Sequence, residues 1–185
     1  MLSRPSWSAA STLSPDPATA AELRRAADRA ALCSSSNASG RGLRGEYFAQ
    51  EVGRGAPLLS RVDTTVDFDA ALEWPANLEG RRPGAVRWSG WVRPPISGRY
   101  RFQFDQPGAT VTVAKETLVD NGAEAGTGIE LSAGRYYPIT IEARNLFAMQ
   151  RRLRLEWMTP YGAKYVVPRG LLFLPTETVS SELRP

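Results

Sequence analysis

Carboxylates are the side chains of this chain whose spacing could do chemistry. Asp67 and Asp69 alternate along an expected strand and therefore share one of its faces, an arrangement that could serve as the acid and base of a glycoside hydrolase. The sequence contains no histidine, which removes the commonest general base, the nucleophile triads that depend on it and the usual zinc ligand sets. Aspartates near strand ends more often hold turns, so we do not expect an enzyme.

Basic residues offer a second chemistry, the binding of a phosphate, a glycan or a nucleic acid. The formal net charge is only +4, from 23 basic and 19 acidic residues. Arg152 and Arg154 belong to the densest basic group, but they alternate with leucines, which indicates a strand with one solvated face. Nucleic acid is therefore not an expected partner.

The elements that position these groups read as an all-β domain. The chain has 185 residues, 42% of them hydrophobic and 23% charged, which is typical of a soluble globular domain with a tail. Short alternating runs separated by glycine and proline turns predict strands at 43–48, 62–68, 85–92, 98–104, 110–113, 128–131, 136–143, 152–158 and 165–167. About nine or more short antiparallel strands predict a β-sandwich or barrel.

Residues 1–41 differ in composition from the rest. They begin with a stretch rich in serine, proline and alanine that favours disorder. Asp16 followed by Pro17 is a helix start signal, and it predicts a short helix over 18–32. We therefore expect a disordered and helical tail over 1–41, a β domain over 42–175 and a C-terminal tail over 176–185.

The expected helix has a thin apolar face, mostly alanine with Leu23 and Leu32. Such a face hardly supports an isolated helix, so the segment either docks on a partner or serves as a linker. Trp7 is a further candidate for contact with a partner protein. No apolar run approaches the roughly 20 residues that cross a membrane, and no secretion signal is visible near the beginning.

Several motifs along the β region follow one family pattern. In chain order they are GLRGEYF (42–48), RVD (61–63), VDFD (66–69), VRWSGW (86–91), PPISGRYRF (94–102), LVDN (118–121), LSAGRYYPI (131–139) and LRLEW (153–157). In this order they resemble the PA14 domain. The resemblance implies a β-sandwich or barrel-like fold, a binding role without chemistry of its own, and an extracellular or surface location.

In lectin-type members of that family, two adjacent aspartates joined by a cis peptide, with a later asparagine, hold a calcium ion that bridges to sugar hydroxyls. When the alignment is anchored on Gly108 and the strand after it, the family's Asp-Asp-Gly falls on Gln106, Pro107 and Gly108. When it is anchored on the preceding strand, the two aspartates fall on Asp105 and Gln106. At least one carboxylate is then missing, although calcium needs several oxygen ligands. We therefore expect no metal or other cofactor. Proline lowers the cost of a cis bond, so we expect a cis bond between Gln106 and Pro107.

Asn145 matches the family's later asparagine, and a turn residue is the alternative interpretation. Phe147 lies in the loop where lectin-type members carry specificity, and its apolar tip favours contact with a protein. Trp88 and Trp157 are expected in the core. Trp91, on the opposite strand face from Trp88, is the better candidate for an exposed binding tryptophan.

These observations predict a non-catalytic interaction module that binds a partner protein within a larger secreted or surface assembly. A carbohydrate-binding module with weak or no calcium dependence is the alternative. The ligand-binding candidates are Asp105, Gln106, Pro107, Asn145, Phe147 and Trp91, and the partner-binding candidates are Trp7, Leu23 and Leu32. The export route and the oligomeric state stay open.

Overall fold

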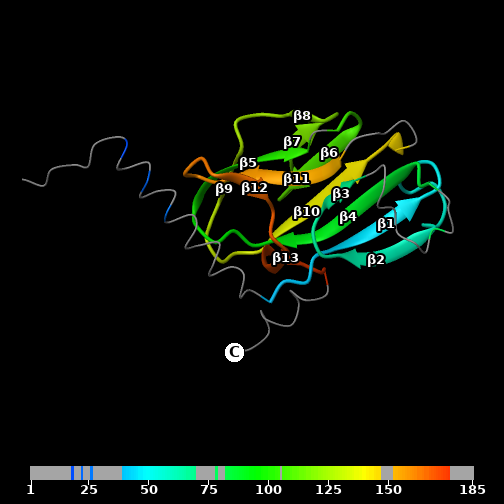
Figure 1. Ribbon diagram of the computed structural model, residues 1–185, viewed down its shortest axis with the longest axis horizontal. Helices are drawn as coiled ribbons and strands as arrows, with labels where there is room; N and C mark the ends of the chain where they lie inside the picture. The colour runs from blue at the N-terminus through cyan, green and yellow to red at the C-terminus, as the bar shows by residue number, and fades with distance from the viewer. Residues whose placement is uncertain are drawn as a thin grey trace, which may run out of the picture.

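The computed structural model describes residues 39–69, 78, 82–104, 106–146 and 152–175, together with Ala18, Glu22 and Ala26. The strands of this part pair antiparallel and form two sheets (Figure 1). The prediction of an all-β domain is confirmed. Alternation of buried and exposed side chains, seen most clearly along β4 and β5, is what one buried face of each sheet requires.

The larger sheet has the strand order β2-β1-β4-β10-β6-β7-β8, and β13 pairs with the end of β4. Its strands are β1 (Leu43–Phe48), β2 (Leu59–Asp63), β4 (Ala85–Val92), β6 (Ala109–Val113), β7 (Glu116–Asp120), β8 (Ala123–Glu124), β10 (Tyr137–Ala143) and β13 (Leu172–Phe173). A single turn of 3-10 helix, η3 (Arg169–Leu171), precedes β13.

The smaller sheet has the order β12-β11-β5-β9, and β3 pairs with β11. Its strands are β3 (Asp67–Asp69), β5 (Gly98–Phe104), β9 (Ile129–Leu131), β11 (Arg152–Met158) and β12 (Lys164–Val166). The two sheets face each other across the core.

Aromatic side chains from both sheets fill that core. Trp88 of β4 lies 6.2 Å from Phe104 of β5, measured between ring centroids, and stacks on Phe68 of β3. Trp157 of β11 packs against Tyr100 at 4.8 Å. Trp88 and Trp157 are fully buried, so the expectation that both belong to the core is confirmed.

The structure corrects the expected strand at 62–68. Its residues divide between β2 in the larger sheet and β3 in the smaller one, and a bend at Thr64 and Thr65 separates the two strands. Buried Val66 keeps the run apolar through the crossing, and for this reason the sequence reads as one strand. Strands β7, β8 and β13 are additions to the sequence prediction.

The expected N-terminal helix gains no support, because the elements of the described residues include no α-helix. Of the segment 18–32, the structure describes only Ala18, Glu22 and Ala26, each in a helical conformation. Trp7, Leu23 and Leu32 lie outside the described residues, as does the segment 176–185. Within the described part, no helix is both long and apolar enough to cross a membrane.

Candidate functional site

The loop between β5 and β6 contains the predicted ligand residues Gln106 and Pro107. Gly108 has a φ of +79°, and the amide of Ala109 donates to the carbonyl of Gln106 at 3.1 Å. These features fit a type II turn with proline at its second position and glycine at its third.

The expected cis bond between Gln106 and Pro107 is wrong, because the described residues contain no cis peptide bond. A cis proline is accommodated at the third position of a turn, whereas Pro107 occupies the second. The turn chemistry of Pro107 and Gly108 therefore favours the trans bond.

This turn is closed by the protein's own groups. The amide of Gly108 donates to Asn121 Oδ1 at 2.8 Å, and the amide of Gly122 donates to the carbonyl of Ala109 at 2.8 Å. A Cβ at Gly122 would overlap the backbone carbonyl of Gln106, so the turn between β7 and β8 lies directly against the loop. The side-chain amide of Gln106 donates to the carbonyl of Pro107 at 3.0 Å.

Asn145 follows β10 and lies next to the same loop. The preceding residue, Arg144, donates its amide to the carbonyl of Gly108 at 3.2 Å. Asn145 is exposed with a φ of 58°, a left-handed conformation that asparagine tolerates. The structure thus brings Gln106, Pro107 and Asn145 to one end of the domain, and Asn145 also has the turn geometry of the alternative interpretation.

Trp91 lies at the opposite end of the β4 ladder. It pairs with Pro138 at the start of β10, whereas Val86 pairs with Ala143 at the end of β10 near the loop. Trp91 lies five residue steps after Val86 along the strand, which corresponds to about 17 Å. Trp91 is half-buried and does not join the loop residues. Asp105 and Phe147 lie outside the described residues.

The described part of this loop does not fit a calcium ion. Pro107 has no side-chain oxygen, and Gln106 Oε1 is a neutral oxygen, buried and without a hydrogen-bond partner among the described residues. Calcium sites combine several oxygens with carboxylate charge. Across the described part of the chain, no three histidine, cysteine, aspartate or glutamate side chains gather closely enough to hold a metal ion.

A polar cleft of about 260 Å³ lies beside the loop. It is lined by Gln103, Phe104, Gly122, Glu124, Glu156 and Lys164. Lys164 Nζ lies 3.0 Å from Glu156, and Arg101 donates to both carboxylate oxygens of Glu124 at 2.6 and 2.7 Å. The cleft therefore offers amide, ammonium and carboxylate groups to a ligand that forms hydrogen bonds. Sequence analysis missed it because its residues come from four separated strands and a turn.

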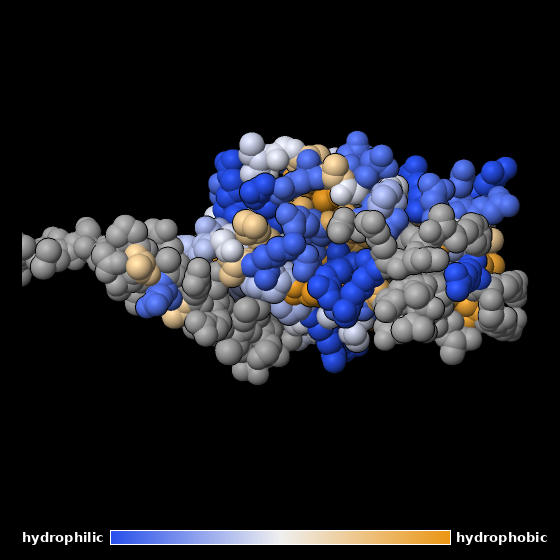
Figure 2. All heavy atoms as spheres, turned by 45° about the horizontal axis from the view of Figure 1, so that its top comes forward, coloured by the Kyte–Doolittle hydropathy of each residue, from blue (hydrophilic) through white to orange (hydrophobic). Residues whose placement is uncertain are grey.

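Arg152 and Arg154 lie on one face of β11, as the alternation predicts. Arg152 Nε donates to Asp67 Oδ1 at 2.6 Å, and Arg154 Nε donates to the same oxygen at 3.1 Å. The pKa of Arg154 is raised by this hydrogen bond and by the charge of Asp67. These ion pairs join β3 to β11, which are also paired as neighbouring strands. Figure 2 shows a face of the molecule whose described atoms are largely hydrophilic.

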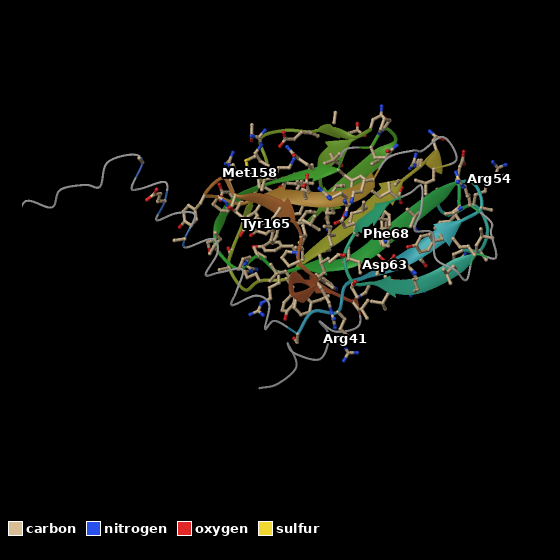
Figure 3. All side chains as sticks on the ribbon, viewed as in Figure 1. Arg41, Arg54, Asp63, Phe68, Met158 and Tyr165 are labelled. Carbon is tan, nitrogen blue, oxygen red and sulfur yellow. The ribbon has the colours of Figure 1, made fainter. Side chains whose placement is uncertain are left out.

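A buried carboxylate from the RVD motif of the sequence lies at the end of β2. Asp63 Oδ2 accepts hydrogen bonds from the Tyr47 hydroxyl at 2.6 Å and from Trp88 Nε1 at 2.7 Å. Arg61 Nε forms an ion pair with Asp63 Oδ1 at 2.6 Å. The Arg61 guanidinium also lies over the rings of Tyr47 and Phe68, and Figure 3 shows Phe68 beside Asp63.

Burial, followed by the charge of Asp63, strongly raises the pKa of the Tyr47 hydroxyl. The hydroxyl therefore stays protonated and acts as a donor. The cluster of Tyr47, Asp63 and Trp88 ties β1, β2 and β4 together at the place where the chain leaves the larger sheet. Its role is structural, because each oxygen of the carboxylate is engaged within the fold.

Residues 39–170 match the family model described as the PA14 domain. The chain belongs to the PA14 domain family. The resemblance of the motifs in the sequence is thereby confirmed.

Among curated proteins, this PA14 domain is similar to anti-sigma-I factor RsgI3 of Acetivibrio thermocellus, with 29% identity over 143 residues. That match covers 74% of this chain and 22% of the relative. A solved anti-sigma factor domain-containing protein from Clostridium clariflavum is 27% identical, with a TM-score of 0.62, over 74% of this chain and 49% of the other. The chain thus spans about a fifth of the curated relative and about half of the solved one.

A solved PA14 sugar-binding domain from an RTX adhesin has a TM-score of 0.55 at 15% identity, and the match covers 74% of this chain and 99% of the adhesin domain. At that identity the likeness concerns the fold alone. The PA14 fold described above is therefore shared with single-domain structures and with parts of longer proteins.

Proposed function

We propose that this PA14 domain is a non-catalytic module that binds a partner protein, without a metal ion, within a larger secreted or surface assembly. The observation that carries the proposal is the closure of the β5–β6 loop by the protein itself. Gly108 donates to Asn121, and Gly122 lies against Gln106. A loop completed in this way needs no cation to order it.

The relatives support a modular role. The similar proteins whose names include an anti-sigma factor are longer than the matched region, which makes up 22% and 49% of them. A domain within a longer chain adds binding to the activity of its neighbours. The names of these relatives describe proteins that act on another protein, and this favours a protein as the partner of the module.

Affinity purification of the tagged chain from its native cells tests the proposal, followed by titration calorimetry with the purified partner. We expect binding that is unchanged by EDTA. Deletion of residues 1–39 tests the partner-binding candidates Trp7, Leu23 and Leu32, and we expect it to weaken binding. A partner that dissociates in EDTA, or a chain that remains a partnerless monomer, would contradict the proposal.

The alternative function is carbohydrate binding that does not depend on calcium. The polar cleft favours it, since Gln103, Glu124, Glu156 and Lys164 present donors and acceptors that suit sugar hydroxyls. A glycan array with and without EDTA separates the two functions. Binding that survives EDTA and is lost in Glu156→Ala supports the alternative, and a silent array supports the partner protein.

A further inference from the structure

Four segments of the chain meet at one end of the sandwich, around η3 and β13. They are residues 39–42, 93–97, 132–136 and 167–171. An added Cβ at Gly40 would lie 2.8 Å from the carbonyl oxygen of Arg169. The amide of Arg93 donates to the carbonyl of Leu171 at 3.0 Å, and its Nε donates to the carbonyl of Gly134 at 3.1 Å. The four segments therefore form one continuous surface.

This surface is rich in arginine, and we call it the arginine end. Each of the four segments contributes one arginine, and together they contain no aspartate or glutamate. The arginines are Arg41, Arg93, Arg135 and Arg169. Arg135 and Arg169 are both exposed, and neither has an ion-pair partner within the described part of the chain. Their two guanidinium groups are thus available to a ligand.

Carboxylates on the strands that border the arginine end do not neutralise it. Glu130 on β9 is paired with Arg99 at 3.0 Å, and Asp63 is engaged in the buried cluster described above. Glu116 begins β7, next to Lys115 and two strands away from β10. The arginine end therefore has an excess of positive charge, which favours an acidic ligand.

The side chains of the arginine end are also of the kinds that protein interfaces use. The guanidinium of Arg93 lies over the ring of Tyr136, 5.6 Å from its centroid, and that ring packs edge-on against Phe173 at 4.9 Å. Arginine and tyrosine are enriched at protein interfaces, where lysine and glutamate are depleted. A guanidinium group also binds a carboxylate through two parallel hydrogen bonds, which an ammonium group does not offer.

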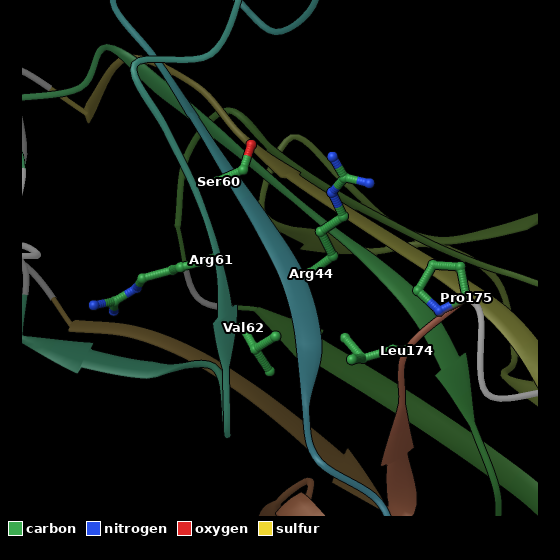
Figure 4. Close-up of a pocket in the computed structure, with 6 residues that line it drawn as sticks. All are labelled: Arg44, Ser60, Arg61, Val62, Leu174 and Pro175. Atoms are coloured by element: carbon green, nitrogen blue, oxygen red, sulfur yellow. The ribbon is translucent and has the colours of Figure 1, made fainter.

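An apolar cavity of about 300 Å³ adjoins the arginine end. It lies over β1, between Val62 on one side and Leu174 and Pro175 on the other (Figure 4). Arg44 also lines it but lies 3.6 Å from Glu46, so the cavity offers apolar walls rather than a free charge. Since Leu174 directly follows β13, the cavity is continuous with the segments around η3.

We propose that the arginine end binds an acidic surface of the partner protein. Carboxylates of the partner pair with Arg135 and Arg169, and an aliphatic side chain enters the cavity beside Val62. An anionic polysaccharide would satisfy the arginines but would leave the apolar cavity unfilled, so the observations favour a protein. This inference rests on the proposed function and names the surface that it uses.

Nuclear magnetic resonance titration of the isotope-labelled full chain tests this surface. The probe is a short synthetic peptide of glutamates with one central leucine. We expect shifts of the amide signals of 132–136 and of 169–174. The double variant Arg135→Glu with Arg169→Glu should weaken binding about 10-fold, because two attractive charges become repulsive.

The matched control is the double variant Arg54→Glu with Arg82→Glu. Both residues are exposed and lie at the other end of the sandwich, and the change in net charge is the same. Figure 3 shows Arg54 far from Arg41, which lies beside η3. At a distance beyond the screening length of physiological salt, about 8 Å, the control should change binding less than about 2-fold.

The cavity is tested by a second peptide, with serine in place of the leucine. It should bind about 3-fold more weakly or less tightly still, because it leaves the cavity unfilled, and Val62→Ser should reduce this difference between the peptides. Equal binding of the two peptides by the unmodified chain would overturn the assignment of the cavity.

The inference as a whole has further outcomes that would overturn it. They are absence of binding by the glutamate peptide, equal effects of the two double variants, and shifts confined to the opposite end of the sandwich. Alginate that binds more tightly than the peptide would also overturn it, in favour of an anionic polysaccharide. A native partner that binds the Arg135→Glu and Arg169→Glu variant with unchanged affinity leaves the proposed function standing while this surface fails.

Discussion

Trp88 Nε1 donates a hydrogen bond of 2.7 Å to Asp63 Oδ2, and this contact joins the middle of β4 to the end of β2. Both side chains are buried, and the buried indole N–H finds its acceptor in this carboxylate. The contact lies where the chain bends at Thr64 and crosses to the smaller sheet. The buried carboxylate of Asp63 thus fixes the position at which the chain passes from the larger sheet to the smaller one.

Asp63→Ala should lower the free energy of unfolding by about 3–5 kcal/mol, because it leaves the Tyr47 hydroxyl and the Trp88 indole without their acceptor and Arg61 without its ion-pair partner. Urea denaturation followed by tryptophan fluorescence measures it. Asp120→Ala, at an exposed position, is the control and should cost less than about 1 kcal/mol. Equal losses of unfolding free energy in the two variants would show that the Tyr47–Asp63–Trp88 cluster does not stabilise the fold more than an exposed aspartate does.

Tyr47 predicts a decline of stability in alkaline solution. Its pKa in the folded protein is raised by burial and by the charge of Asp63, so the folded state holds the proton more tightly than the unfolded state. The resulting stabilisation is fully present below the ordinary tyrosine pKa of about 10 and is lost as the pH rises above that value.

Urea midpoints measured at neutral pH and above about pH 10 test this prediction. The decline should be smaller in Tyr47→Phe than in the unmodified chain. Tyr161→Phe, at a side chain that is 45% exposed, should leave the decline unchanged. An identical pH profile for Tyr47→Phe would refute the assignment.

Alanine substitutions at two glycines with similar backbone conformations test the closure of the β5–β6 loop. Gly122 has a φ of 79° and Gly126 a φ of 76°, so alanine is strained at both. Only at Gly122 does an added Cβ meet the backbone of Gln106; around Gly126 the space is open. Gly122→Ala should therefore cost about 1–3 kcal/mol more than Gly126→Ala in thermal or urea unfolding. Equal costs would mean that the loop does not rest on this turn.

Calcium should leave the thermal midpoint of this PA14 domain unchanged. A ligand that binds the folded state raises stability by mass action, and the described residues of the loop do not fit such an ion. Differential scanning fluorimetry in excess calcium and in EDTA measures the midpoint. A rise in calcium that disappears in Asp105→Asn would show that the loop retains a metal site.

The sequence alone determined the fold class and much of the sheet. The bounds of β1, β4, β5 and β11 agree with the predicted strands, because alternation of apolar and polar residues is a local signal that each strand carries by itself. The motifs around Trp88 and Trp157 also indicated the family and the core. The Asn121-Gly122 turn was predictable for the same reason, since both residues tolerate positive φ.

The tertiary structure decided what depends on contacts between distant residues. Ala114 and Lys115 form a turn with positive φ at both residues, although neither is glycine or asparagine. Because the sequence carries no turn signal there, strand β7 was not predicted. The burial of Asp63 follows from donors 16 and 25 residues away in the chain. Local patterns report which way a side chain faces, whereas the partner that satisfies a buried charge, or the turn that closes a loop, is set only when strands far apart in sequence pack together.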